Sequence, residues 1–162
     1  FIPLGGAVCK CIVCISVCIR LLFCYIGRSC LSSFEGGKMN KSHTEYLFKN
    51  FPFFHPEAPL TESLMAFGFE CGDGWFGLIK KLCEKLKDLD LKDFRVTQVK
   101  EKFGGLRFYV GPIEHKKADK VFRLIDEATR KSYTICEECG GSGKTNKAGW
   151  IKTICDNCRK AH

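Results

Sequence analysis

Residues 94–110, FRVTQVKEKFGGLRFYV, contain two runs of β-branched and aromatic side chains on either side of a glycine pair. β-Branched and aromatic residues favour extended backbone, and adjacent glycines favour a tight turn between strands. The segment therefore predicts a β-hairpin with strands over 94–100 and 106–110 and a turn over 101–105. The residues expected on one shared face of the second strand are Leu106, Phe108 and Val110.

Helical periodicity is present on both sides of this hairpin. Before it, apolar residues recur every three or four positions from Trp75 to Leu89, and charged residues fill the opposite face. This spacing predicts an amphipathic helix with Asp73 as its N-terminal cap. After the hairpin, residues 114–132 predict a second amphipathic helix. The residues of this helix expected to face the core are Ala118, Val121, Phe122, Ile125 and Ala128.

The segment from Met39 to about Phe69 lacks such a pattern. Prolines divide it into clusters of phenylalanine, and proline interrupts regular elements. Because many aromatic rings left in water would be unfavourable, we expect this segment to cover the core as an extended arm, with one helical turn near 44–49. The arm, the hairpin and the two helices together indicate an α+β domain over residues 39–132.

Two CxxC motifs follow the second helix. Fifteen residues separate Cys139 from Cys155, a spacing at which two tight turns can present four thiolates to one tetrahedral ion. Glycines after the first motif leave backbone amides free to turn toward the sulfurs. We therefore expect one structural Zn²⁺ in a knuckle or ribbon module over residues 133–162, docked on the α+β domain. The predicted ligands are Cys136, Cys139, Cys155 and Cys158.

Unligated core cysteines or a redox disulfide pair are the alternatives to a metal site. His162 could also replace one thiolate, although a frayed terminus is the simpler interpretation. The run from Cys136 to Gly143 resembles one CxxCxGxG repeat of DnaJ-type chaperones. Those proteins use several such repeats, so this resemblance implies a metal and no chaperone function.

Two further motifs are weaker. Residues 141–145, GSGKT, resemble the end of a phosphate-binding P-loop, but Glu138 stands where that loop requires glycine. We expect residues 144–147 to form an exposed loop. Cys71 precedes the first helix, where a reactive thiolate is conceivable, but a small buried side chain fits better, as it does for Cys83. No catalytic residue is assigned.

Residues 1–38 differ from the rest of the chain. Six of the twelve cysteines lie there, and the first methionine, Met39, follows Glu35-Gly36-Gly37-Lys38. Codons for this run can spell a purine-rich ribosome-binding site ahead of a start codon, so we expect residues 1–38 to be upstream translation that is not native. The alternatives are a signal or membrane segment, because residues 7–26 are largely apolar apart from two basic side chains, and a structured arm.

The composition, with 45% hydrophobic and 27% charged residues, is that of a folded globular protein. The formal net charge is +8, and residues 1–38 contribute four basic groups and one acid, so the remainder carries +5. Four thiolates and one Zn²⁺ would lower this to about +3. The part expected to fold is therefore only mildly basic, and its charge alone does not require a nucleic-acid partner.

Three stretches carry a wider resemblance: residues 69–75 (FECGDGW), residues 98–109 (QVKEKFGGLRFY) and the CxxCG unit that begins at Cys136. They resemble small uncharacterised proteins of phages and prophages that end in a CxxC…CxxC unit, over about residues 47–160. The resemblance implies a phage-related origin and the cytoplasm of a bacterial or phage-infected cell. It implies no biochemical activity.

Basic side chains decorate the predicted hairpin and the loops around the cysteines. They could contact the phosphates of DNA or RNA, while Trp150 or Tyr109 could stack on a base. We therefore predict a zinc-binding accessory protein that acts as a nucleic-acid-binding module. Its predicted contact residues are Arg95, Lys100, Lys102, Arg107, Lys144, Lys147, Lys152, Arg159 and Lys160.

The alternative is a protein-interaction module for a host or phage protein, in which zinc only stiffens a small scaffold. An excess of aromatic residues supports it, since these could form an exposed patch as readily as a core. An enzyme is a third interpretation, but four cysteines would leave no open metal position. No membrane partner is expected if residues 1–38 are not native. The aromatic residues in question are Phe51, Phe53, Phe54, Trp75 and Phe76.

Overall fold

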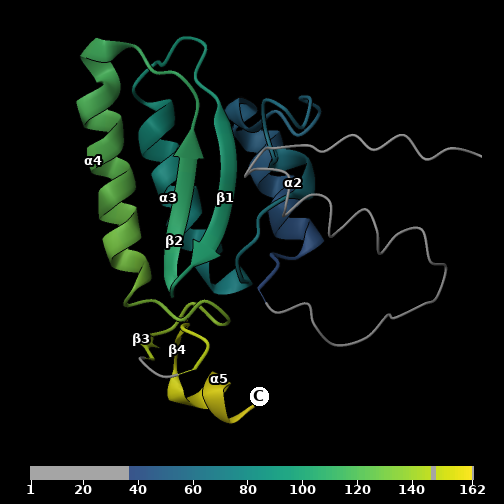
Figure 1. Ribbon diagram of the computed structural model, residues 1–162, viewed down its shortest axis with the longest axis vertical. Helices are drawn as coiled ribbons and strands as arrows, with labels where there is room; N and C mark the ends of the chain where they lie inside the picture. Colours follow the sequence, from purple (N-terminus) through teal and green to yellow (C-terminus); the bar gives the residue numbers. More distant parts are fainter. Residues whose placement is uncertain (1–36, 147–148, 162) are drawn as a thin grey trace, which may run out of the picture. The chain divides into compact units, whose positions relative to one another are not determined.

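A two-stranded antiparallel hairpin lies at the centre of the fold (Figure 1). The computed structural model describes residues 37–146 and 149–161, and within them the hairpin consists of β1, Val96–Lys102, and β2, Gly105–Val110. The predicted hairpin is therefore confirmed. The shared face of β2 contributes to the core through Leu106 and Phe108, which are buried, and Val110, which is partly buried.

The turn between the strands is shorter than predicted. Lys102 pairs with Gly105, so the loop contains only Phe103 and Gly104. Both loop residues have left-handed backbone angles, with φ of 54° and 74°. These angles belong to the two-residue hairpin turns whose twist matches that of the strands. Residues 101 and 102, predicted as part of the turn, extend β1 instead.

Both edges of the hairpin are covered by other parts of the chain. Along β1, the backbone N–H groups of Leu64 and Glu70 donate to strand carbonyls at 2.8 and 3.0 Å. Along β2, the N–H of Leu106 donates to the Ser132 hydroxyl at 2.9 Å. An open strand edge can pair with another chain, and these contacts remove that hazard.

Two amphipathic helices, α3 (Phe76–Lys87) and α4 (His115–Ser132), pack against each other, and their buried residues share one core with the hairpin. Figure 1 shows α4 running beside β2. The prediction that Phe122 faces the core is wrong, because this side chain is 51% exposed. Val121 and Ile125 define the buried stripe, and each step along a helix turns a side chain by about 100°, which carries position 122 toward solvent.

The N-terminal arm contains more helix than predicted. Instead of one turn near 44–49, α2 spans Lys41–Asn50, because the Asn40 side chain caps it by accepting the N–H of His43 at 2.8 Å. Pro52 begins a short 3₁₀ helix, Pro52–Phe54, after α2 ends. The aromatic residues then enter the core, where the rings of Phe54 and Phe69 meet edge to face at a centroid distance of 5.0 Å.

The five aromatic residues considered for an exposed patch contribute to the core instead. Phe51, Phe54 and Trp75 are buried, and Phe53 and Phe76 pack against the core while partly buried. Trp75 lies in the 3₁₀ helix Asp73–Trp75, and its ring N–H donates to the Ile135 carbonyl at 2.9 Å. A second such turn spans Met65–Phe67.

The sequence predicted Asp73 as the N-terminal cap of α3, but this prediction is wrong, because no side chain caps α3. The Asp73 carboxylate instead accepts the N–H of Asn40 at 2.9 Å and contacts the His43 ring at 2.9 Å. Partial burial opposes ionisation of Asp73, but the bonds from Asn40 and His43 outweigh it and lower the pKa of this carboxyl. Asp73 therefore ties the N-terminus of α2 to the segment that precedes α3.

Replacing Asp73 with alanine is expected to lower the free energy of unfolding by about 1 kcal/mol at neutral pH, since a helix start loses an acceptor and a negative charge. Urea denaturation measures this loss. Asp126→Ala is the control, because the exposed Asp126 side chain on α4 makes no hydrogen bond or ion pair within the described part of the chain. The free energy of unfolding of this variant should change by no more than about 0.5 kcal/mol. Equal losses in both variants would contradict the role of Asp73.

The described residues thus form a mixed α+β fold of four helices and an antiparallel hairpin with a C-terminal cluster of four cysteines, which confirms the predicted fold class. The C-terminal segment contributes β3 (Lys144–Thr145), β4 (Thr153–Ile154) and α5 (Asp156–Lys160). None of the described helices is both long and apolar enough to span a bilayer. The expectation for residues 1–38 lies outside the described residues except at Gly37 and Lys38.

Candidate metal centre

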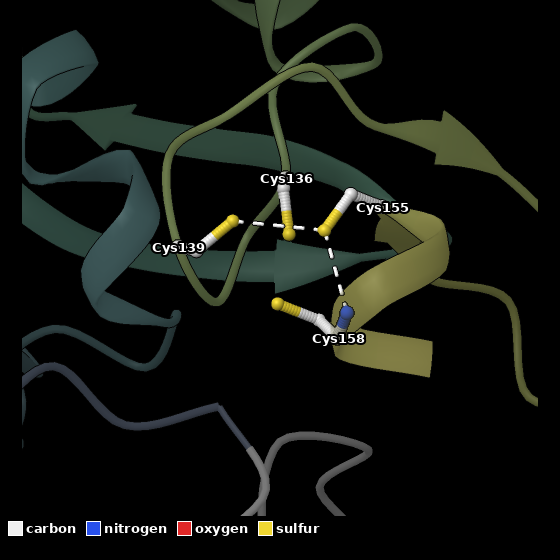
Figure 2. A group of neighbouring side chains, drawn as sticks. All are labelled: Cys136, Cys139, Cys155 and Cys158. Carbon is white, nitrogen blue, oxygen red and sulfur yellow. Dashed lines mark hydrogen bonds between the residues drawn. The ribbon is translucent and has the colours of Figure 1, made fainter. Parts of the chain in front are cut away.

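The first CxxC motif lies in a tight loop after α4. The N–H of Cys136 donates to the Gly141 carbonyl at 2.7 Å, and the N–H of Gly140 donates to the Cys136 carbonyl at 2.9 Å. Gly140 has a φ of 76°, a conformation that glycine adopts without strain. Figure 2 shows that the loop directs the sulfurs of Cys136 and Cys139 into the same space.

The second CxxC motif is presented by the short hairpin of β3 and β4, in which Lys144 pairs with Ile154. Cys155 follows β4 directly and caps α5, because its sulfur accepts the N–H of Cys158 at 3.4 Å. The helical turn returns Cys158 toward the same centre (Figure 2). One thiol pair therefore comes from a loop and the other from a helix start.

The four sulfurs have the spacing of a single tetrahedral metal site. All four lie within 4.8 Å of one another, and the Cys139 and Cys155 sulfurs are 3.7 Å apart. A tetrahedron with zinc–sulfur bonds of about 2.3 Å has edges of about 3.8 Å. None of the four forms a disulfide. The cluster of Cys136, Cys139, Cys155 and Cys158 can thus hold one metal ion.

The thiols influence one another electrostatically. The N–H of Cys158 stabilises the Cys155 thiolate and lowers the pKa of Cys155 to about 7. The neighbouring sulfur of Cys155 in turn raises the pKa of Cys158 well above its usual range. A cation at the centre would offset the repulsion among thiolates, and metal binding displaces the thiol protons.

No family model matches the chain, and neither a curated protein nor a solved structure gives a match. The resemblance to phage and prophage proteins therefore stays a prediction. A function for the chain has to be inferred from the geometry of the described residues.

The first cysteine loop is seated on Gly72 and Gly74, a contact that the sequence did not reveal. The N–H of Gly74 donates to the Glu137 carbonyl at 2.7 Å. A Cβ atom added at Gly74 would lie 2.1 Å from the Cys136 carbonyl oxygen and 2.4 Å from the Gly140 nitrogen. Only glycine allows this backbone approach, so the GDG motif seats the cysteine loop as well as beginning the 3₁₀ helix Asp73–Trp75.

Glu137, between the first two cysteines, is also a functional residue that sequence reasoning missed. Its side chain is fully buried; one carboxylate oxygen accepts the N–H of Gly72 at 3.0 Å, and the other has no hydrogen-bond partner among the residues that the structure describes. Burial raises the pKa of Glu137, while the Gly72 N–H and the Lys152 charge oppose the rise. The carboxyl joins the cysteine loop to the α+β core.

The nine predicted nucleic-acid contacts fall into three groups. Three are engaged elsewhere: Arg95 pairs with Glu62, Lys152 pairs with Glu138 at 3.3 Å, and Arg107 donates to the Tyr133 hydroxyl at 3.3 Å. Lys147 lies outside the described residues, as does His162. The remaining five make no ion pair within residues 37–146 and 149–161: Lys100, Lys102, Lys144, Arg159 and Lys160.

The structure also places residues 144–146 and the cysteines Cys71 and Cys83, which the sequence left as weak candidates. Lys144 and Thr145 belong to β3, so the predicted loop over 144–147 begins as a strand. Cys71 and Cys83 are both buried in the core, where burial raises the pKa of each thiol well above its usual value. A raised pKa keeps these thiols protonated, which does not favour a nucleophilic role.

Proposed function

We propose that the chain is a zinc-stabilised nucleic-acid-binding module. The metal part of the proposal is supported by the donor set, since four thiolates at tetrahedral spacing select a soft or borderline ion such as Zn²⁺ over magnesium or calcium. Cys136, Cys139, Cys155 and Cys158 would hold the ion and fill its coordination sphere. The proposal therefore assigns the metal a structural role.

The observation that carries the nucleic-acid part is the outer face of the hairpin. Lys100 lies opposite Arg107, and Gln98 lies opposite Tyr109, so these side chains share one face. The Lys100 ammonium lies 5.5 Å from the centre of the Tyr109 ring, which is 42% exposed. An unpaired lysine beside an exposed ring provides both a phosphate contact and a surface for a base.

The test is the affinity of the zinc-loaded protein for a labelled oligonucleotide at several salt concentrations. We expect affinity to fall steeply with salt, since phosphate contacts release counterions. The double variant Lys100→Gln/Lys102→Gln should bind about tenfold more weakly, with a salt dependence smaller by roughly two counterions. Binding is measured by fluorescence anisotropy.

The matched control is Lys116→Gln/Lys120→Gln, which removes two exposed charges from α4. If net charge alone determined binding, both double variants would lose the same affinity. That result would contradict the hairpin face as the contact surface, and absence of any binding would contradict the proposal as a whole.

A protein-interaction module is the second candidate, and a groove between α3 and α4 favours it. The groove has a volume of about 540 Å³ and combines an apolar floor with a charged rim, where Lys85 and Glu127 form an ion pair at 3.1 Å. An amphipathic helix of a partner would match this chemistry. The apolar floor consists of Leu78, Leu82, Leu124, Ala128 and Ile135.

A further inference from the structure

A groove lies where the tip of the β1–β2 hairpin meets the β3–β4 hairpin. The two hairpins join through the Thr153 hydroxyl, which donates to the Gly104 carbonyl at 2.6 Å. Figure 1 shows β3 and β4 at the turn end of the long hairpin. The groove has a volume of about 340 Å³, and its lining residues are Glu101, Lys102, Phe103, Gly149, Trp150 and Ile151.

Two aromatic rings in this groove face solvent. Trp150 is 73% exposed and Phe103 is 63% exposed, more than any other large hydrophobic side chain in the described residues. Single exposed aromatic rings are common, but two that line one groove form an apolar surface of the kind that marks a binding site. The rings come from segments far apart in the sequence and are brought together only by the docking of the two hairpins.

The backbone of Phe103 supports a functional role for its ring. Phe103 occupies the left-handed first position of the turn, with a φ of 54°. Asparagine, aspartate and glycine are preferred there, and a bulky side chain is unfavourable. Residues with unfavourable backbone angles are common at functional sites. Here the turn conformation places the Phe103 ring in solvent.

Hydrogen bonds from Asn146 hold the backbone at Trp150 and Lys152. The Asn146 side chain donates to the Trp150 carbonyl at 2.8 Å and accepts the N–H of Lys152 at 2.6 Å. The backbone N–H of Asn146 also donates to the Lys152 carbonyl at 3.0 Å. The backbone carbonyl of Trp150 is therefore tied to Asn146, and such anchoring lowers the entropic cost of binding.

The groove lining contains one cation that can contact a phosphate, Lys102, and one carboxylate, Glu101. The Lys102 ammonium lies 5.4 Å from the centre of the Phe103 ring and makes no ion pair within the described part of the chain. Of the acids nearby, Glu101 accepts the N–H of Gly104 at 2.6 Å, and Glu138 pairs with Lys152. Lys102 also continues the row of cations on the outer face of β1, two residues from Lys100.

We infer that this groove binds the unstacked bases of a single-stranded nucleic acid, between Phe103 and Trp150, with Lys102 contacting phosphate. The inference rests on the proposed function and specifies its ligand. Base faces are hidden in a duplex but available in a single strand, so exposed aromatic rings beside lysines select single strands with little sequence preference.

Trp150 provides a direct readout. The chain has two tryptophans, and Trp75 is fully buried. Titration of the zinc-loaded protein with a thymidine homopolymer should therefore quench the emission of Trp150, while a duplex of mixed sequence should quench it little. Trp150→Ala should bind the single strand at least about fivefold more weakly.

Phe103→Asn tests the second ring without endangering the fold, because asparagine favours the left-handed turn. It should also bind the single strand at least about fivefold more weakly. Phe122→Ala is the matched control, since Phe122 is 51% exposed on α4 and does not line this groove. Zinc content and thermal unfolding confirm that each variant is folded.

The outcomes separate the two levels of the proposal. One outcome is salt-sensitive binding that is equal for single strand and duplex and unchanged in both aromatic variants. This outcome would overturn the single-strand inference but would not contradict the hairpin face as the contact surface. Absence of binding to either nucleic acid would overturn both. Selective binding of the single strand, weakened in both aromatic variants and unchanged in Phe122→Ala, is the expected result.

Discussion

Replacement of Cys136 with serine is expected to abolish stoichiometric metal binding and to unfold the C-terminal segment. Apparent binding energies of structural zinc in small modules are on the order of 10 kcal/mol, and this energy is folding energy. Cys136 is the buried member of the cluster, so its loss removes the ligand nearest the core. Elemental analysis should find about one Zn²⁺ in the parent protein and far less in the variant.

The loss should extend into the α+β core, because Gly74 and Trp75 bond to the backbone around the first cysteine loop. We expect the melting temperature to fall by more than about 10 °C, which corresponds to several kcal/mol for a domain of this size. A chelator should lower the melting temperature of the parent protein by a similar amount and leave that of Cys136→Ser unchanged.

Cys83→Ala is the control for this experiment. Its thiol is buried in α3 and belongs to no cluster of metal ligands among the described residues. The control should keep its metal and lose only about 1–2 kcal/mol from packing. A Cys136→Ser protein that retained one tightly bound zinc, or a parent protein unaffected by chelation, would contradict the proposed metal centre.

Gly74→Ala is expected to be the most damaging change outside the cluster. The added methyl group would lie 2.1 Å from the Cys136 carbonyl oxygen and 2.4 Å from the Gly140 nitrogen, so the cysteine loop must move away. Overpacking against rigid backbone costs about 3 kcal/mol, and the bond from Gly74 to the Glu137 carbonyl would weaken as well. The free energy of unfolding in denaturant and the affinity for zinc should both decrease.

Gly77→Ala provides a matched control three residues away. A Cβ atom there meets nothing within 4 Å, and Gly77 lies in α3, where alanine is preferred over glycine. This variant should therefore be unchanged or more stable by about 0.5 kcal/mol. Equal stability of the two variants would contradict the docking of the cysteine loop on Gly74.

Periodicity made the main elements of the fold predictable. The hairpin around Gly104-Gly105 and the amphipathic helices form through local backbone preferences and through burial of one face. The spacing of residue types along the chain reveals both of these causes. Errors arose where a neighbouring segment decides the outcome. The register of one helix turned Phe122 outward, and Asp73 found its partners in Asn40 and His43, 30 or more positions earlier in the chain.

The sequence by itself determined the hairpin, two of the helices and the spacing of the four cysteines, because these depend on residue order within short segments. Only the tertiary structure decided that Gly74 seats the cysteine loop and that Phe103 and Trp150 line one groove. Those contacts join residues about 50 or more positions apart through backbone packing and hydrogen bonds. No local periodicity records such contacts, since they exist only after the hairpins and the cysteine loop have docked.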